Sequence, residues 1–84
     1  MKRPRPGAKF LQMQQTKVLQ VIKDLAYFSE KPTDVTFERV MSQVAMERGI
    51  TLSALEALQE RHLITMNGSI ILLTEKGEHT ITDL

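Results

Sequence analysis

The dipeptide Asn67-Gly68 constrains the fold of this chain strongly. It lies between two β-prone runs, residues 63–66 and residues 69–73. Asn-Gly suits both central positions of a type I′ turn, because each of them requires a positive φ angle. The sequence therefore predicts a two-stranded β-hairpin near the C-terminal end.

Amphipathic segments occupy the chain before this hairpin. In residues 10–28, apolar residues recur at steps of three, four and seven between Gln, Lys and Asp residues. This spacing predicts a helix of about four to five turns with one buried stripe. Residues 29–34 are polar and contain Pro32, so the helix should end there and the chain should turn.

A second helix is expected just after this turn. Asp34 or Thr36 is available as its N-cap, and Gly49 is available as its C-terminal stop. Its apolar residues have the spacing of one helix face: Phe37, Val40, Met41, Val44 and Ala45.

A third helix should follow a tight turn at residues 49–51. Either Ser53 with Glu56 forms a capping box at its start, or Thr51 is the cap. After the hairpin, Thr74 begins either one more helical turn, weakened by Gly77, or a frayed end. The inner face of the third helix is marked by three leucines: Leu52, Leu55 and Leu58.

Length and composition indicate one small globular domain. A chain of 84 residues can bury one hydrophobic core and no second one. It contains no cysteine, so disulfides and thiolate-ligated metals are excluded. The sequence has neither an apolar run long enough for a membrane span nor a secretory signal pattern, and a cytoplasmic location is therefore expected.

The charge is unevenly distributed. Residues 1–9 hold Lys2, Arg3, Arg5 and Lys9 and no acid, whereas the remainder holds seven bases and ten acids, a formal charge of −3. Proline and glycine in residues 1–9 disfavour a helix. We expect a flexible basic arm at 1–9 and a mildly acidic folded domain at 10–84.

The predicted order of helix, helix, tight turn, helix and hairpin is that of a winged helix-turn-helix. The fold class expected is α+β and mainly helical, with three helices and a two-stranded wing. The stretches GITLSALEALQERHLI and LTEKGE resemble the end of MarR-type and related bacterial and archaeal DNA-binding domains. The resemblance covers roughly residues 11–80, and the residues specific to it lie within 49–78.

This resemblance implies that the third helix reads the major groove of DNA. Ser and Thr can bond to several base edges, and Ala can contact a thymine methyl group. Two departures from the family pattern are His62, where glycine is usual, and the two-residue wing turn. The acids Glu56 and Glu60 lie nearby on the same helix. The outward positions that match the family's groove contacts are Thr51, Ser53, Ala54 and Ala57.

Two further segments are candidates for DNA contact. The basic arm, through Lys2, Arg3, Arg5 and Lys9, could follow a minor groove or phosphates, or it could be a solubilising tail. Asn67 and Ser69 at the hairpin tip could touch DNA as wings do, although the turn alone explains Asn67-Gly68.

No catalytic, metal or cofactor site is expected. The sequence lacks a nucleophile with a nearby base and a phosphate-binding glycine loop, and its two histidines have no converging ligands. The function predicted is a sequence-specific DNA-binding transcription regulator. The alternative is a winged-helix module that binds a protein and makes no direct DNA contact. The apolar stripe of residues 10–28 is wide enough to suggest a homodimer through this helix.

Overall fold

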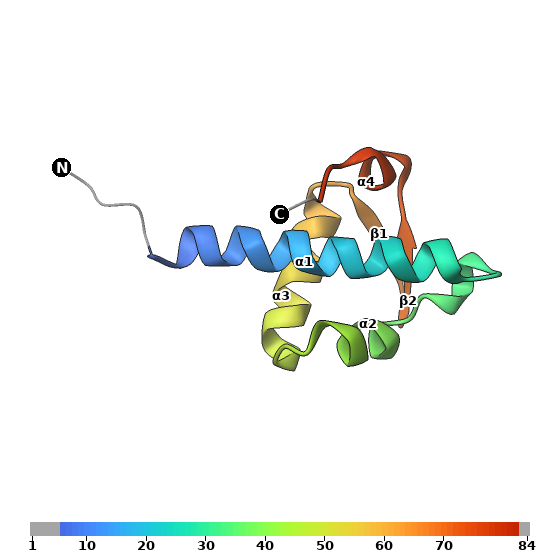
Figure 1. Cartoon of the computed structure of the whole chain (residues 1–84), viewed down its shortest axis with the longest axis horizontal. Coiled ribbons are helices and arrows are strands. Elements are labelled where there is room, and N and C mark those ends of the chain that lie inside the picture. Colours follow the sequence, from blue (N-terminus) through green and yellow to red (C-terminus); the bar gives the residue numbers. More distant parts are fainter. Residues whose placement is uncertain (1–5, 83–84) are drawn as a thin grey trace.

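The computed structural model describes the backbone of residues 6–82 and the side chains of residues 12–31 and 33–82. The described part is α+β and mainly helical, with three helices followed by a two-stranded antiparallel hairpin, an order compatible with a winged-helix layout (Figure 1). The elements are α1 (Pro6–Phe28), a 3₁₀ helix η1 (Pro32–Asp34), α2 (Phe37–Val44), α3 (Arg48–Glu60), β1 (Ile64–Asn67), β2 (Ile70–Leu73) and α4 (Glu75–His79).

Helix α1 is longer than the sequence pattern indicates. It begins at Pro6 and not at residue 10, so residues 6–9 are helical, and the prediction that they belong to a flexible arm without helix is wrong. Proline is tolerated in the first helical turn, because its missing N–H would have no helical partner there and its φ angle already fits. Although α1 has 23 residues, no helix within residues 6–82 is both long and apolar enough to cross a membrane.

One apolar core joins all the main elements. Helix α1 packs against α2, α3 and β2, and Figure 1 shows it running in front of α3. The helix contributes three residues to the core because Val18, Leu19 and Ile22 share one side of it. The other buried core residues are Val35, Phe37, Val40, Val44, Ala54, Leu55, Leu58, Leu63, Ile64 and Ile71.

Helix α2 begins as predicted but ends earlier. The Thr36 side chain accepts a hydrogen bond from the backbone N–H of Arg39 at 3.3 Å, so Thr36 is the N-cap. The helix ends at Val44 because Ala45 adopts a left-handed conformation with φ +53°. The prediction that Gly49 ends this helix is wrong, since Gly49 lies inside α3.

Helix α3 therefore starts about one turn earlier than expected. Its N-cap is Glu47, whose side chain makes no capping hydrogen bond. Neither proposed cap is correct: Ser53 lies in the second turn, and the hydroxyl of Thr51 donates to the carbonyl oxygen of Glu47 at 3.1 Å. Leu55 and Leu58 are fully buried, as predicted, and Leu52 is half-buried against the core.

The hairpin is present, but its turn lies one residue later than expected. Asn67 pairs with Ile70, so Gly68 and Ser69 occupy the two central positions. Gly68 has φ +62° and Ser69 does not have a positive φ, which fits a type II′ turn and not the predicted type I′ turn. Only glycine takes this first position without strain.

A short strand-like segment before α2 extends the hairpin, and the sequence pattern did not reveal it. Thr36 forms an isolated antiparallel bridge with Ile70. The N–H of Phe37 donates to the Ser69 carbonyl at 2.7 Å, and the N–H of Ile71 donates to the Val35 carbonyl at 2.9 Å. The hairpin is thus hydrogen-bonded to the first residue of α2.

Candidate nucleic-acid interface

Helices α2 and α3 follow one another with a turn at residues 45–47 between them, an order compatible with a helix-turn-helix. Arg48 is the first residue of α3 and is exposed. Its guanidinium carbon lies 5.1 Å from the centroid of the Phe37 ring at the start of α2, a distance typical of a cation–π contact. This contact places a permanent positive charge beside the first residue of α2.

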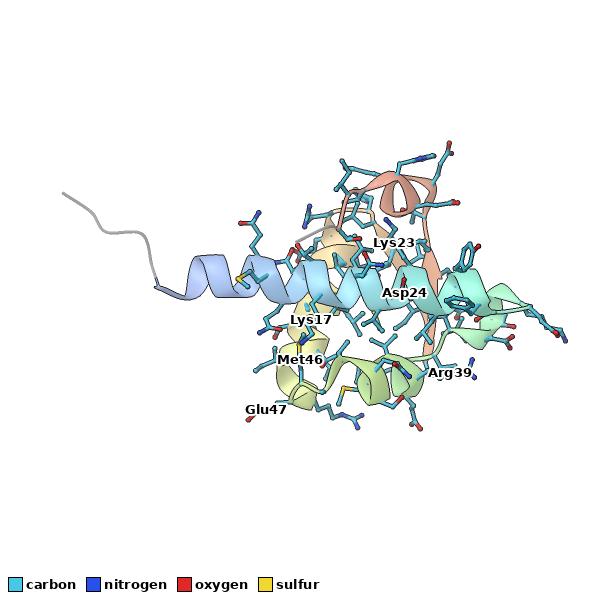
Figure 2. The ribbon with its side chains drawn as sticks, in the orientation of Figure 1. Lys17, Lys23, Asp24, Arg39, Met46 and Glu47 are labelled. Carbon is cyan, nitrogen blue, oxygen red and sulfur yellow. The ribbon has the colours of Figure 1, made fainter. Side chains whose placement is uncertain are left out.

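A second exposed cation lies on α2. Arg39 is in the first turn of this helix (Figure 2), and its Nη1 donates to the carbonyl oxygen of Asp34 at 3.4 Å. Sequence reasoning overlooked both arginines. The predicted third helix starts after the turn at residues 49–51 and therefore leaves out Arg48, whereas α3 begins at this residue. The turn before Arg48 is Ala45-Met46-Glu47, and Glu47 makes no capping hydrogen bond, so no conventional local signal marks the start of α3 there.

The structure separates the four residues that the family resemblance suggested on the third helix. Thr51 and Ala54 are 0% and 5% exposed, so the prediction that they face outward is wrong. The buried residues of α3 are 51, 54, 55 and 58, which follow helical spacing and define its inner face. Two side chains buried in the core cannot reach a base edge.

Ser53 and Ala57 lie at the boundary between α3 and α1. Ser53 is exposed and Ala57 is half-buried. With Gln14 and Gln15 of α1, they border a small cavity of about 140 Å³. Of the four predicted positions, only Ser53 combines exposure with a place near the first turn of α3.

The second half of α3 is acidic on its free side. Glu56, Gln59 and Glu60 are exposed and border a shallow depression of about 370 Å³. The charge of the helix therefore changes along its axis, from Arg48 at its start to two carboxylates further along. Only the first turn and a half presents a surface suited to an anion.

The hairpin turn lies close to the start of α2. Asn67 and Ser69 are both exposed, and the carbonyl of Ser69 accepts the hydrogen bond from Phe37 described above. Two predicted contact residues are thus brought near the helical turn that carries Arg39. Of the predicted basic arm, Lys2, Arg3 and Arg5 lie outside the described residues, as does the side chain of Lys9.

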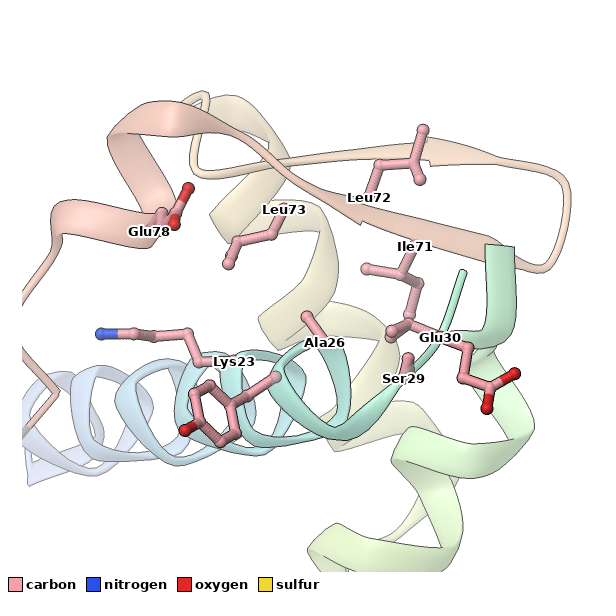
Figure 3. Close-up of a pocket in the computed structure, with 10 residues that line it drawn as sticks. Lys23, Ala26, Ser29, Glu30, Ile71, Leu72, Leu73 and Glu78 are labelled. Carbon is pink, nitrogen blue, oxygen red and sulfur yellow. The ribbon is translucent and has the colours of Figure 1, made fainter. Parts of the chain in front are cut away.

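A larger groove lies between the end of α1 and strand β2. It measures about 490 Å³, and Figure 3 shows Ala26, Ile71 and Leu73 lining its apolar part. Charged side chains stand at its edges, among them Lys23, whose Nζ donates to the carbonyl oxygen of Thr80 at 2.8 Å. The sequence pattern did not reveal this groove, because its walls come from residues 23–35 and 71–78, which are far apart in the sequence.

No family model, curated protein or solved structure matches this chain. The functional assignment therefore depends on the geometry and charge of the site itself. Within residues 6–82, no three His, Asp or Glu side chains gather in a way that could hold a metal ion.

Proposed function

We propose that this chain is a sequence-specific DNA-binding transcription regulator of the winged helix-turn-helix type. In this proposal the first turn of α3 enters the major groove. The observation that carries it is the exposed Arg48 at the first position of α3. Recognition helices read base edges mainly with their N-terminal residues, and arginine is the commonest specific reader, through two hydrogen bonds to guanine.

Neighbouring residues supply contacts that orient the domain on the duplex. Arg39 on α2 is placed to contact phosphate, and Ser53 can bond to a base edge or a phosphate. Asn67 and Ser69 at the hairpin turn would flank the same duplex. The basic arm would add electrostatic attraction that does not depend on base sequence.

The acids of α3 do not exclude this docking. Glu60 follows Arg48 by twelve residues, which is about 18 Å along a helix axis at about 1.5 Å per residue. At physiological salt the Debye length is about 8 Å, so repulsion between Glu60 and phosphates near Arg48 is strongly screened. Glu56 is closer, and it would limit how deeply the helix enters.

Binding to duplexes selected from a random pool tests the proposal. We expect Arg48→Ala to weaken binding of the selected duplex by about 1–3 kcal/mol, or roughly 5- to 150-fold. Arg61→Ala is the matched control, since Arg61 is an exposed arginine at the other end of α3 and bonds to Gln15. Fluorescence anisotropy at two salt concentrations gives both affinities. Equal losses for the two variants would contradict groove docking.

A protein-binding module is the second candidate. The exposed acidic half of α3 and the apolar groove beside β2 favour it, because an acidic surface repels the duplex. A synthetic peptide of residues 1–9 separates the two functions. If the whole chain binds DNA no better than this peptide, the DNA proposal fails and the protein-binding function is favoured.

A further inference from the structure

The outer side of α1 carries a stripe of exposed residues that the core does not use. Met13, Tyr27 and Phe28 are 55%, 82% and 81% exposed. Lys17 and Asp24 are exposed between them, and Figure 2 labels both on this helix. At about 100° per residue these five positions fall within one sector of roughly 100°, on the side opposite the buried residues of α1. The outer stripe is defined by these five residues.

The C-terminal end of the outer stripe is aromatic. The rings of Tyr27 and Phe28 pack edge to face with centroids 5.0 Å apart. Adjacent aromatic side chains that are more than four-fifths exposed form an apolar surface of a kind that often marks an interaction site. Met13 gives the other end of the stripe an apolar side chain that packs well against aromatic rings.

We propose that a second copy of this chain covers the outer stripe, with the two α1 helices antiparallel and the two-fold axis between Gln20 and Val21. In this register Lys17 lies opposite Asp24 of the partner subunit. Met13 lies opposite Phe28 of the partner subunit. Both contacts occur twice, as the two-fold symmetry of a homodimer requires.

Charge complementarity selects the antiparallel arrangement. Lys17 and Asp24 are seven residues apart, or about 10 Å along one helix, so they are too distant to pair within one chain. A parallel arrangement in register would place lysine against lysine and aspartate against aspartate, which is repulsive. The antiparallel register instead gives two opposite-charge pairs and two methionine–aromatic contacts.

The dimer does not depend on the proposed DNA function. The outer stripe faces away from the core that α3 helps to form, so both copies of Arg48 stay accessible. The paired stripe extends from residue 13 to residue 28, about 22 Å of helix. Such a contact falls below the usual size of a permanent interface, so we expect a concentration-dependent dimer with a Kd on the order of 10–100 µM.

A charge swap tests the pairing by sedimentation velocity. Lys17→Glu and Asp24→Lys should each weaken the dimer about tenfold, because attraction becomes repulsion at two places. The double variant should restore the dimer to within about threefold of the unchanged chain, since the pairs are then reversed. Lys76→Glu makes the same charge change on α4 and should leave dimerisation unaltered. A double variant weaker than both single variants would overturn the register.

Single cysteines test the direction of the helices, because the chain has no cysteine of its own. Gln20→Cys lies beside the proposed axis and should form a disulfide-linked dimer under mild oxidation. Met13→Cys should not, because its two copies would be about 22 Å apart. Efficient crosslinking through position 13 would indicate parallel helices and overturn the proposal. A chain that stays monomeric at millimolar concentration would overturn it as well, whatever its affinity for DNA.

Discussion

Gly77 packs directly against the backbone carbonyl of Leu63. A Cβ at position 77 would lie 2.0 Å from the Leu63 oxygen and 2.9 Å from its carbon. The same carbonyl accepts a hydrogen bond from the N–H of Thr74 at 3.1 Å. The Thr74 hydroxyl caps α4 by accepting the N–H of Gly77 at 3.0 Å. Helix α4 is therefore a defined element held against the start of the hairpin, and of the two predicted alternatives the helical turn is present and the frayed end is not.

Gly77→Ala should destabilise the protein by about 2–3 kcal/mol or more, because backbone atoms block the added methyl group and cannot move aside cheaply. Urea unfolding followed by circular dichroism measures the loss. Lys76→Ala, at the exposed neighbouring position, should change stability by less than about 0.5 kcal/mol. A similar small change for Gly77→Ala would show that α4 is not packed in this way.

His62→Gly should stabilise the protein by about 1 kcal/mol, because His62 holds a left-handed conformation that glycine adopts without steric cost. Its φ angle is +61°. The N–H groups of His62 and Leu63 donate to the carbonyls of Gln59 and Leu58, each at 3.0 Å, which is the Schellman pattern at a helix C-terminus. The midpoint temperature of thermal unfolding should therefore rise in this variant.

The matched control for this change is Gln59→Gly. Gln59 is exposed within α3, where glycine should cost about 1 kcal/mol relative to a good helix former. Opposite signs for the two glycine substitutions are expected. A loss of stability in both would mean that residue 62 does not need a left-handed conformation.

Gly49→Ala should stabilise the protein by about 0.5 kcal/mol, because alanine favours the helix and restricts the unfolded chain. Gly49 lies in the first turn of α3, and a Cβ there would meet nothing within 4 Å. If Gly49 instead ended the preceding helix in a left-handed conformation, the same change would destabilise the protein. Chemical denaturation therefore distinguishes the two positions of the turn.

Thr51→Ala and Ser53→Ala should have different effects. Thr51 is fully buried and bonds to the Glu47 carbonyl, so its loss should cost about 1–2 kcal/mol of stability. Ser53 is exposed, so its replacement should alter stability by less than about 0.5 kcal/mol. Denaturation and DNA binding measured on both variants check this. A change in DNA affinity for the folded Thr51 variant alone would contradict the burial.

Local sequence patterns were sufficient to predict which elements are helices and which are strands, and most of their positions. The spacing of Phe37, Val40 and Val44 predicted α2 and its inner face, and the β-prone runs around Gly68 predicted the hairpin. These features depend on side chains within a few residues of one another, and such short-range preferences can be recognised in the sequence alone. The broad class, helices followed by a hairpin, was accordingly correct.

The start of α3 could not be predicted from the sequence in the same way. The sequence offers Thr51 and Ser53 as conventional caps, whereas the helix begins at Arg48 after Glu47, which makes no capping bond. Burial of Leu55 and Leu58 in the core outweighs a missing cap, since a cap contributes only about 1 kcal/mol and a buried leucine side chain contributes about 1.5–3 kcal/mol. The packing of α3 turns Thr51 and Ala54 inward, and the earlier start adds the exposed Arg48 to the helix.

The order of the elements, the single core and the uneven charge follow from the residues alone, because each depends on local spacing or composition. Three features could be seen only in the tertiary structure. They are the rotation of α3 about its axis, the hydrogen bond between Ile71 and Val35, and the contact of Gly77 with Leu63. Each of them depends on how distant segments pack together, through the shapes of their side chains and their backbone hydrogen bonds. The polarity of neighbouring residues in the sequence determines neither the packing nor these hydrogen bonds.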